Sequence, residues 1–501
     1  MMKLPNSIRN WLSLLGAGIA AMNLFIIGFL LALSFFYNIG SSYSGLFIYI
    51  ILPMFFVGGL ILIPIGMIRT NRKLKRKLLP EDKLDWPKID FNEPKVRNIS
   101  IIFTFGTVFI LIISSMGSYH AFHYTESTEF CGKLCHQVMA PEFTAYHQSS
   151  HERVKCVECH VGEGSGWYMR SKLSGLYQVY SVLAKKYPKP ITTPLENLRP
   201  ARETCEQCHW PQKFYDSKLK NKRSYLADET TTDHTIVMKM KTSASLSANG
   251  ISEGIHWHIN PDIKIEYIAS SRDREKLPWV KYTNLKTGKV KIYLEPDNLL
   301  NQKQIDSLET RTMDCLDCHN RPSHDYHNPQ NFIDEFISSG EISKYLPDIK
   351  VVCMDILIQE YPSTDSAMIA IKNQVLEYYE IMYPEIIESN KEAINKAIAT
   401  IQKGYTSNIF PEMGVNWKVY PNHLGHLETN GCFRCHNDKH VTDQGETISR
   451  DCNLCHDIVS QGKTGEMKNG TLTQPLEFFH PVDIDKEWKT QLCSECHEQL
   501  Y

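Results

Sequence analysis

The sequence predicts an N-terminal anchor of three membrane helices, followed by a large exported region with little regular structure. Two observations lead to this fold class. Three runs without a charged residue lie at 11–37, 45–68 and 99–118. Fourteen of the fifteen cysteines form seven close pairs, and a histidine directly follows each pair. Together they predict a membrane-anchored multihaem cytochrome c, whose haem-packed region also contains a small β insertion and a helical insertion.

The three apolar runs are long enough to cross a membrane as helices. A hydrocarbon core is about 30 Å thick and a helix rises about 1.5 Å per residue, so about 20 residues span it. The first run is too long for the core of a signal peptide, so we expect it to be retained. Six basic residues within 69–77, against none within 38–44, predict a cytoplasmic N-terminus and a periplasmic haem region, in a bacterial inner membrane.

The cysteine pairs carry the attachment signature of haem c. In Cys-x-x-Cys-His both thiols bond to haem vinyl groups and the histidine is the proximal iron ligand. Zinc ribbons, the alternative, need no histidine directly after the second cysteine. Only the first motif, in EFCGKLCHQVM, has three residues between its cysteines. The predicted sites are Cys131, Cys135 and His136; Cys156, Cys159 and His160; Cys205, Cys208 and His209; Cys315, Cys318 and His319; Cys432, Cys435 and His436; Cys452, Cys455 and His456; and Cys493, Cys496 and His497.

The exported region divides by composition. Strand-like alternation in IVMKMK, IHWHI, IKIEYIA and KVKIYL predicts the β insertion. In the helical insertion, Asp365 or a neighbour caps one helix, Pro384 interrupts the pattern, and the next helix ends at Gly404. The leftover Cys353, in VVCMD, is expected to be a buried thiol. The predicted segments are 1–118 (anchor), 119–225 (motifs one to three), 226–310 (β insertion), 311–328 (motif four), 329–410 (helical insertion) and 411–501 (motifs five to seven).

Seven haems need up to seven further axial ligands, and thirteen histidines lie outside the motifs. Spare histidines beside haems usually give bis-histidine ligation, which lowers the potential and leaves no open position on the iron. Local spacing favours His151, His324, His440 and His480, followed by one member of each remaining close pair. For His147 and His234 we expect ordinary roles. The candidate distal ligands are His151, His256, His258, His324, His423, His426, His440 and His480.

The stretch from YTESTEFCGKLCHQVMAPEFTAYHQSSHERVKCVECH to NLRPARETCEQCHWP resembles the NapC/NirT (NrfH-like) family of membrane-anchored, quinol-oxidising cytochromes c. The resemblance covers about residues 99–210, and the total of seven motifs looks most like the heptahaem inner-membrane cytochromes of metal-respiring bacteria. It implies that a quinol docks beside the first haem and gives it electrons. It also implies that Met139 replaces the motif histidine on that iron, that His151 is a distal ligand, and that Lys172 lies near the quinol.

The chain departs from this family in three ways. Its first motif has an extra residue, and it has three membrane helices where the family usually has one. Where the family often has a carboxylate, some seven residues after the lysine, this chain has Val179 beside Gln178. The quinol-site candidates are therefore Met139, Lys172 and Gln178, with His120 and His123 as possible replacements for the missing proton acceptor.

We expect a quinol dehydrogenase that passes electrons from menaquinol or ubiquinol through seven covalent haems to a periplasmic cytochrome or reductase, in anaerobic or extracellular respiration. Two alternatives stay open. A terminal reductase of a small nitrogen or sulfur oxyanion would need an open iron site. A non-catalytic electron-wire subunit of a larger membrane complex would take electrons from another protein. The net charge of −2 does not indicate a nucleic-acid-binding protein.

Overall fold

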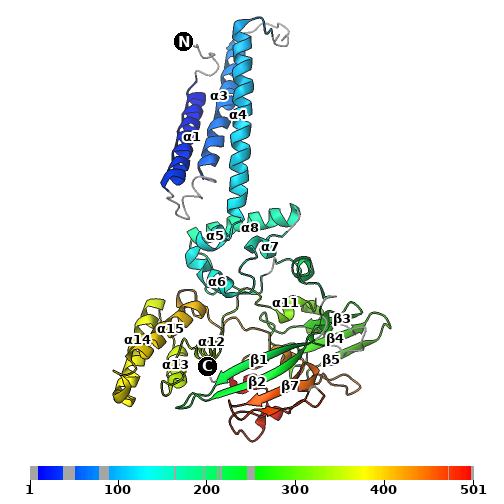
Figure 1. Ribbon diagram of the computed structural model, residues 1–501. Coiled ribbons are helices and arrows are strands. Elements are labelled where there is room, and N and C mark those ends of the chain that lie inside the picture. Colours follow the sequence, from blue (N-terminus) through cyan, green and yellow to red (C-terminus); the bar gives the residue numbers. More distant parts are fainter. Residues whose placement is uncertain are drawn as a thin grey trace. The chain divides into compact units, whose positions relative to one another are not determined.

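The computed structural model describes residues 10–37, 51–77, 90–162, 165–195, 198–211, 214, 217–244, 254–471 and 473–497. The chain folds into two compact units, Met1–Met139 and Ala140–Tyr501 (Figure 1). The first unit therefore contains the first cysteine motif as well as the anchor, and the second contains the other six motifs. The finer predicted segment boundaries remain predictions.

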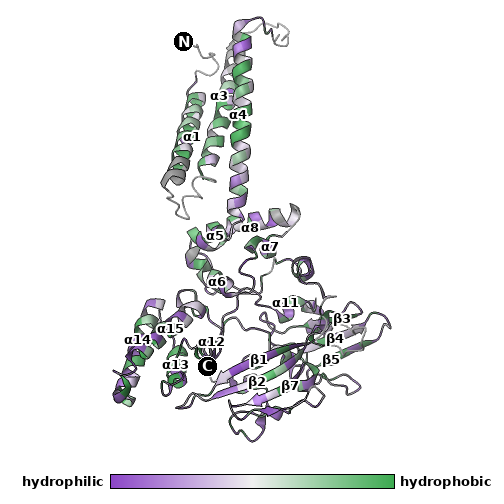
Figure 2. Ribbon diagram, viewed as in Figure 1, coloured by the Kyte–Doolittle hydropathy of each residue, from purple (hydrophilic) through white to green (hydrophobic). Residues whose placement is uncertain are grey.

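The described part of the first unit contains three helices that are long and apolar enough to cross a membrane. They are α1 (Trp11–Tyr37), α3 (Leu52–Lys77) and α4 (Pro94–Thr125), and the ribbon in Figure 2 shows many hydrophobic residues along them. Helix α1 coincides with the first predicted run, while α4 extends beyond the third run at both ends. Small residues let α1 and α3 pack closely, because a Cβ on Gly16 would lie 2.6 Å from the carbonyl oxygen of Gly59.

Four helices follow the anchor. Helix α5 (Thr128–Lys133) is capped by Ser127, whose side chain accepts a hydrogen bond from the backbone of Phe130. Helix α6 (His136–Gln148) begins at the histidine of the first motif. The second motif forms α7 (Cys156–His160), and the longer helix α8 (Ser165–Leu183) follows it. The second motif thus forms a short helical turn.

Two antiparallel sheets lie in the second unit. One has the order β1 (Ser217–Tyr225), β2 (Asp233–Lys241), β7 (His456–Gly462), β8 (Lys468–Asn469). The other has the order β5 (Val290–Leu294), β4 (Trp279–Asn284), β3 (Ile263–Ile268), β6 (Thr310–Thr312). The first sheet is completed by β7, which comes from the C-terminal motif segment, so the β residues are not a closed insertion.

Three of the four expected strands are present, as β2, β3 and β5. The fourth expectation, a strand at IHWHI, was wrong, because these residues form the 3-10 helix η4 (Ile255–Ile259). Strand β1 was not predicted. Its sequence SKLKNKRSY is highly charged, and it becomes a strand through nine-residue pairing with β2, which sequence alternation alone does not reveal.

The helical insertion contains α12 (Pro329–Ser338), α13 (Ile349–Leu357), α14 (Thr364–Met382) and α15 (Lys391–Asn408). They enclose one hydrophobic core that includes the buried Cys353. Ser363, a neighbour of Asp365, caps α14, as predicted. The predicted end of the last helix at Gly404 was wrong. Gly404 lies inside α15, where the absence of a side chain lets Phe332 pack against the helix.

The rest of the second unit is built from short turns and loops, as expected for a region that packs around haems. The short helices are α9 (Ala201–Thr204), α10 (Gln302–Ser307), α11 (Cys315–Cys318) and α16 (Cys493–His497). The 3-10 turns are η2 (Cys205–Gln207), η5 (Pro296–Asn298), η6 (Pro384–Ile386), η7 (Pro411–Met413), η8 (Gly431–Arg434), η9 (Cys452–Leu454) and η10 (Glu487–Lys489).

Candidate haem-binding sites

Each motif of the second unit makes about one helical turn. In the third, fourth and fifth motifs the backbone N–H of the histidine donates to the carbonyl of the first cysteine, at 2.8, 2.8 and 3.1 Å. Residues three and four apart in such a turn project from the same side. The two thiols and the imidazole of a motif can therefore face one haem, with sulfur at its edge and nitrogen at its centre.

A second histidine lies opposite the motif histidine at six motifs. The ring centres of these pairs are 5.8 to 6.3 Å apart. In motif order the pairs are His160 with His324, His209 with His151, His319 with His256, His436 with His258, His456 with His426, and His497 with His480.

This spacing fits one iron between each pair of rings. A histidine nitrogen binds a metal at about 2.0–2.1 Å, and the ring centre lies about 1 Å beyond, so two rings on opposite sides of one ion have centres about 6 Å apart. Directly packed rings cover a wider range, with 4.2 Å for His426 and Phe433 and 6.3 Å for Phe25 and Phe29, so it is the recurrence of a distance near 6 Å at six motif histidines that indicates a shared iron. The residues thus fit a haem at each of these six motifs.

The second ring nitrogen is held in five of the six partner histidines that lie outside the motifs. Outside the motifs, Nδ1 lies within hydrogen-bond distance of a backbone carbonyl in His151 (Pro322, 3.0 Å), His256 (Thr242, 2.7 Å), His258 (Ile255, 2.9 Å), His324 (Glu142, 3.0 Å) and His480 (Val482, 2.8 Å). A carbonyl can only accept, so Nδ1 carries the proton and Nε2 presents its lone pair. This is the tautomer that an iron ligand needs.

Burial keeps two of the facing imidazoles neutral, those of His258 and His426. It lowers the pKa of His258 to about 4 and likewise lowers the pKa of His426 to about 4. The neighbouring motif histidine lowers each pKa further. Because a protonated imidazole has no lone pair for a metal, these shifts favour the form that binds iron.

His440 does not lie opposite a motif histidine. It is fully buried, with Nδ1 3.0 Å from the Asn437 side chain and Nε2 2.8 Å from the carbonyl of Leu277. Both nitrogens are therefore occupied by protein groups, which argues against its predicted role as a ligand. The spacing CHNDKH was misleading, because the fifth motif instead faces His258, nearly two hundred residues earlier in the chain.

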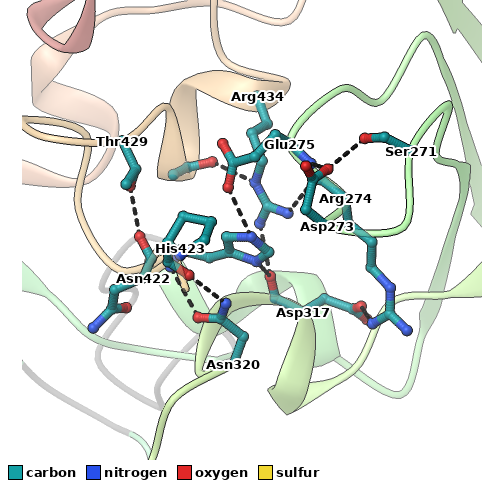
Figure 3. A network of polar contacts seen from close by, with 12 residues as sticks. Ser271, Asp273, Arg274, Glu275, Asp317, Asn320, Asn422, His423, Thr429 and Arg434 are labelled. Carbon is teal, nitrogen blue, oxygen red and sulfur yellow. Dashed lines mark hydrogen bonds and ion pairs between the residues drawn. The ribbon is translucent and has the colours of Figure 1, made fainter. Parts of the chain in front are cut away.

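His423 is also drawn into protein contacts. Its Nδ1 lies 3.2 Å from the carbonyl of Asp317 and its Nε2 lies 2.9 Å from Glu275 (Figure 3). Its neighbour His426 is the member of the pair that faces a motif histidine. His324 follows the fourth motif in sequence, but it faces His160 of the second motif.

The network around His423 also joins two motifs. Asp317, inside the fourth motif, is buried and accepts hydrogen bonds from Tyr267 and Arg274. Arg434, inside the fifth motif, donates to the carbonyl of Asp317 at 2.7 Å and to that of Arg274 at 2.9 Å (Figure 3). Residues between the cysteines of the fourth and fifth motifs therefore hold the helical turns of these two motifs together. Sequence reasoning had assigned them no role.

One large cavity connects the motifs of the second unit. Its volume is about 3230 Å³, and both cysteines and the histidine of the third, fourth, fifth and sixth motifs are among its lining residues, with members of the second and seventh. Pockets for a single small molecule measure about 300–1,000 Å³. The cavity is therefore large enough to hold several large cofactors.

Successive motifs approach one another inside the unit. Beside burial, the thiols of Cys205 and Cys208 contribute to the raised pKa of Cys159. A hydrogen bond joins Cys205 to Cys315. The charge of Cys432 likewise contributes to the raised pKa of Cys318 and of Cys455, and that of Cys452 to the raised pKa of Cys493. Each motif from the second to the seventh thus has the next motif of the sequence as a neighbour.

The quinol-site candidates are divided between the two units. In the first unit Met139 is half-buried on α6, while His120 and His123 are exposed on α4. In the second unit Lys172 is half-buried and Gln178 is exposed on α8. The side chain of His136 lies outside the described residues. A shared pocket formed by these residues therefore stays a prediction.

Comparison with known proteins agrees with these sites. Residues 93–192 match the N-terminal region of the NapC/NirT cytochrome c family. The cytochrome c-type protein ImcH of Geobacter sulfurreducens is 43% identical over 495 residues, which cover 99% of this chain and 96% of that protein. No solved structure matches significantly. With three apolar helices, haem-attachment motifs and near full-length similarity to ImcH, the chain belongs to the NapC/NirT family of multihaem cytochromes c.

Proposed function

We propose that this protein carries seven covalent haems, oxidises membrane quinol at the first, and delivers the electrons to a periplasmic acceptor. The observation that carries the proposal is the set of six histidine pairs, spaced for iron ligation on both faces. Iron held in this way exchanges electrons and has no position open for a substrate. This favours electron transfer over the reduction of a small oxyanion.

The motif order supplies a route. Because each motif from the second to the seventh neighbours the next, the chain arranges its haem sites as a row in sequence order. Bound haem supplies one-electron redox chemistry at each site. The protein contributes the fixed spacing, for example through Arg434 and Asp317 between the fourth and fifth motifs. The route then leads from the membrane-proximal end of the sequence to its C-terminal end.

The family match supports quinol as the electron donor. It covers the third apolar helix, the first motif, Met139 and Lys172. The basic segment 69–77, at the end of α3, supports a cytoplasmic position for that end, which would put the haem region in the periplasm. Low-potential bis-histidine haems suit menaquinol, the lower-potential quinol, as the substrate.

Anaerobic reduction of the purified protein in liposomes tests the proposal. Menaquinol and ubiquinol analogues are added separately, haem reduction is followed by absorbance, and dithionite then gives full reduction. We expect rapid reduction by the menaquinol analogue, and slower reduction in a Lys172→Met variant whose dithionite spectrum is unchanged. Reduction by dithionite but by neither quinol would contradict quinol oxidation and favour an electron-wire subunit of a larger complex.

A further inference from the structure

Helix α8 carries a stripe of exposed apolar side chains. Among the residues that the structure describes, none of the second unit covers this stripe. Six large side chains form it, each 52–80% exposed, in contrast to Val179 and Val182, which are half-buried. At 100° per residue the six fall within one arc of about 120°. The stripe consists of Met169, Leu173, Leu176, Tyr177, Tyr180 and Leu183.

The charged residues in and just after α8 are all basic. Residues 165–195 contain Arg170, Lys172, Lys185, Lys186 and Lys189, and no aspartate or glutamate. The rest of the chain has 49 basic and 56 acidic residues, so its net charge is negative. The basic residues flank the stripe at both ends. An acidic protein partner and an anionic lipid surface would both suit this charge.

The composition of the stripe distinguishes between the two. Leucine and methionine occupy its length, two tyrosines lie among them, and Lys186 donates to the hydroxyl of Tyr180 at 3.2 Å. Tyrosine beside lysine is typical of the level where lipid headgroups meet acyl chains. The chain also carries three membrane-crossing helices, the last of which ends 40 residues before α8 begins. The same chain therefore brings a lipid surface as a partner for this segment.

We propose that α8 is an interfacial membrane helix, with its apolar stripe in the acyl boundary and its basic flanks at anionic headgroups. This gives the haem region a second attachment to the membrane besides the three spans. The inference does not depend on quinol oxidation, because it rests on the surface of α8 alone.

Photolabelling from the lipid tests the proposal on the full haem-loaded protein. The protein is placed in nanodiscs of phosphatidylglycerol that contain a phospholipid with a diazirine in its acyl chain. After irradiation and trypsin digestion, peptides are analysed by mass spectrometry. The peptide 173–185 carries five stripe residues, and 373–391 carries the exposed Ile381 and Met382 of α14 as a matched control. We expect label on the first peptide and none on the second.

Two variants distinguish the loss of a membrane contact at the stripe from a general effect of an added charge on α8. Leu176→Glu places a charge in the stripe, and we expect labelling of this peptide to be lost while the haem spectrum is unchanged. Ser174→Glu adds the same charge about 120° away from the centre of the stripe, and labelling should persist. If the wild-type peptide stays unlabelled while α1, α3 and α4 are labelled, the stripe faces water, the first unit or a second copy, and the proposal is wrong.

Discussion

At the scale of single residues, the contact of Nε2 separates His440 and His423, whose Nε2 lies against a protein group, from the histidines that face a motif. His256 and His258 donate Nδ1–H to the carbonyls of Thr242 and Ile255, and their rings face different motif histidines. His440 instead uses both nitrogens within the protein. The second hydrogen bond, which a sequence does not show, decides which spare histidines are available to iron.

The pairing of His324 with His160 can be tested by combining substitutions. His324→Ala should convert one low-spin haem to a high-spin form, because it removes one axial ligand. Adding His160→Ala should convert no further haem, since both residues would serve the same iron. Adding His256→Ala should convert a second. The high-spin EPR signal per protein measures the number of converted haems, and two conversions in the first combination would contradict the pairing.

His440 offers a contrasting substitution. His440→Phe should leave all haems low-spin but lower the thermal midpoint, because the carbonyl of Leu277 and the side chain of Asn437 lose a buried partner. An unsatisfied buried polar group costs about 1–3 kcal/mol. Absorbance and EPR spectra, recorded with thermal melting, check both parts. A new high-spin haem in this variant would show that His440 is a ligand after all.

Met139 tests the unusual first site. Its backbone N–H bonds to the carbonyl of Cys135 at 2.9 Å, so it lies one turn beyond the motif. Met139→Ala should alter one haem alone and lower its potential, because methionine ligation raises the potential above that of bis-histidine haems. Potentiometric titration follows this haem, and Met169→Ala, on α8, is the control. Unchanged potentials in Met139→Ala would show that Met139 is not a ligand of the first iron.

At the scale of elements, the sequence predicted what local patterns determine. The three apolar helices, the Ser363 cap region of α14 and strands β2, β3 and β5 all carry their signal within a few residues. Strand β1 and helix η4 do not. The charged β1 is stabilised by pairing with β2, which itself pairs with β7 more than two hundred residues later. Such long-range pairing overrides local propensity.

Gly404 shows the same principle in a helix. A glycine near the end of an amphipathic pattern usually marks termination, yet here α15 continues to Asn408. Gly404→Ala should therefore destabilise the helical insertion, because the new Cβ would lie 2.7 Å from the ring of Phe332. Overpacking costs about 1–3 kcal/mol, against a gain of about 1 kcal/mol in helix propensity.

Thermal melting of the haem-loaded protein measures this effect. The matched control is Gly175→Ala in α8, where an added Cβ meets nothing within 4 Å. It should leave the midpoint unchanged or raise it. If Gly404→Ala is as stable as the control substitution, the close approach of Phe332 does not determine the continuation of α15.

At the scale of the whole molecule, the cysteine motifs predicted the cofactor but not the connections between sites. Motif histidines and attachment cysteines are adjacent in sequence, so their signal is local. The partners in the six pairs lie up to 178 residues from the motif histidine, as His258 does from His436. Only the folded chain brings them together. His324 and His440 both lay close to a motif in sequence, and neither faces that motif.

The six pairs together predict how the whole protein responds to small ligands. If each of the six irons is held on both faces, carbon monoxide added to the dithionite-reduced protein should bind at most one haem, the first, whose methionine is the weaker ligand. Carbon monoxide difference spectra, calibrated by haem content, give the number bound. Nitrite or hydroxylamine should likewise give no turnover with reduced protein. The His324→Ala variant is the positive control, since its opened iron should bind one more carbon monoxide. Binding at two or more haems of the unmodified protein would mean that irons of the second unit are open, and the oxyanion reductase would then become the better explanation of the fold.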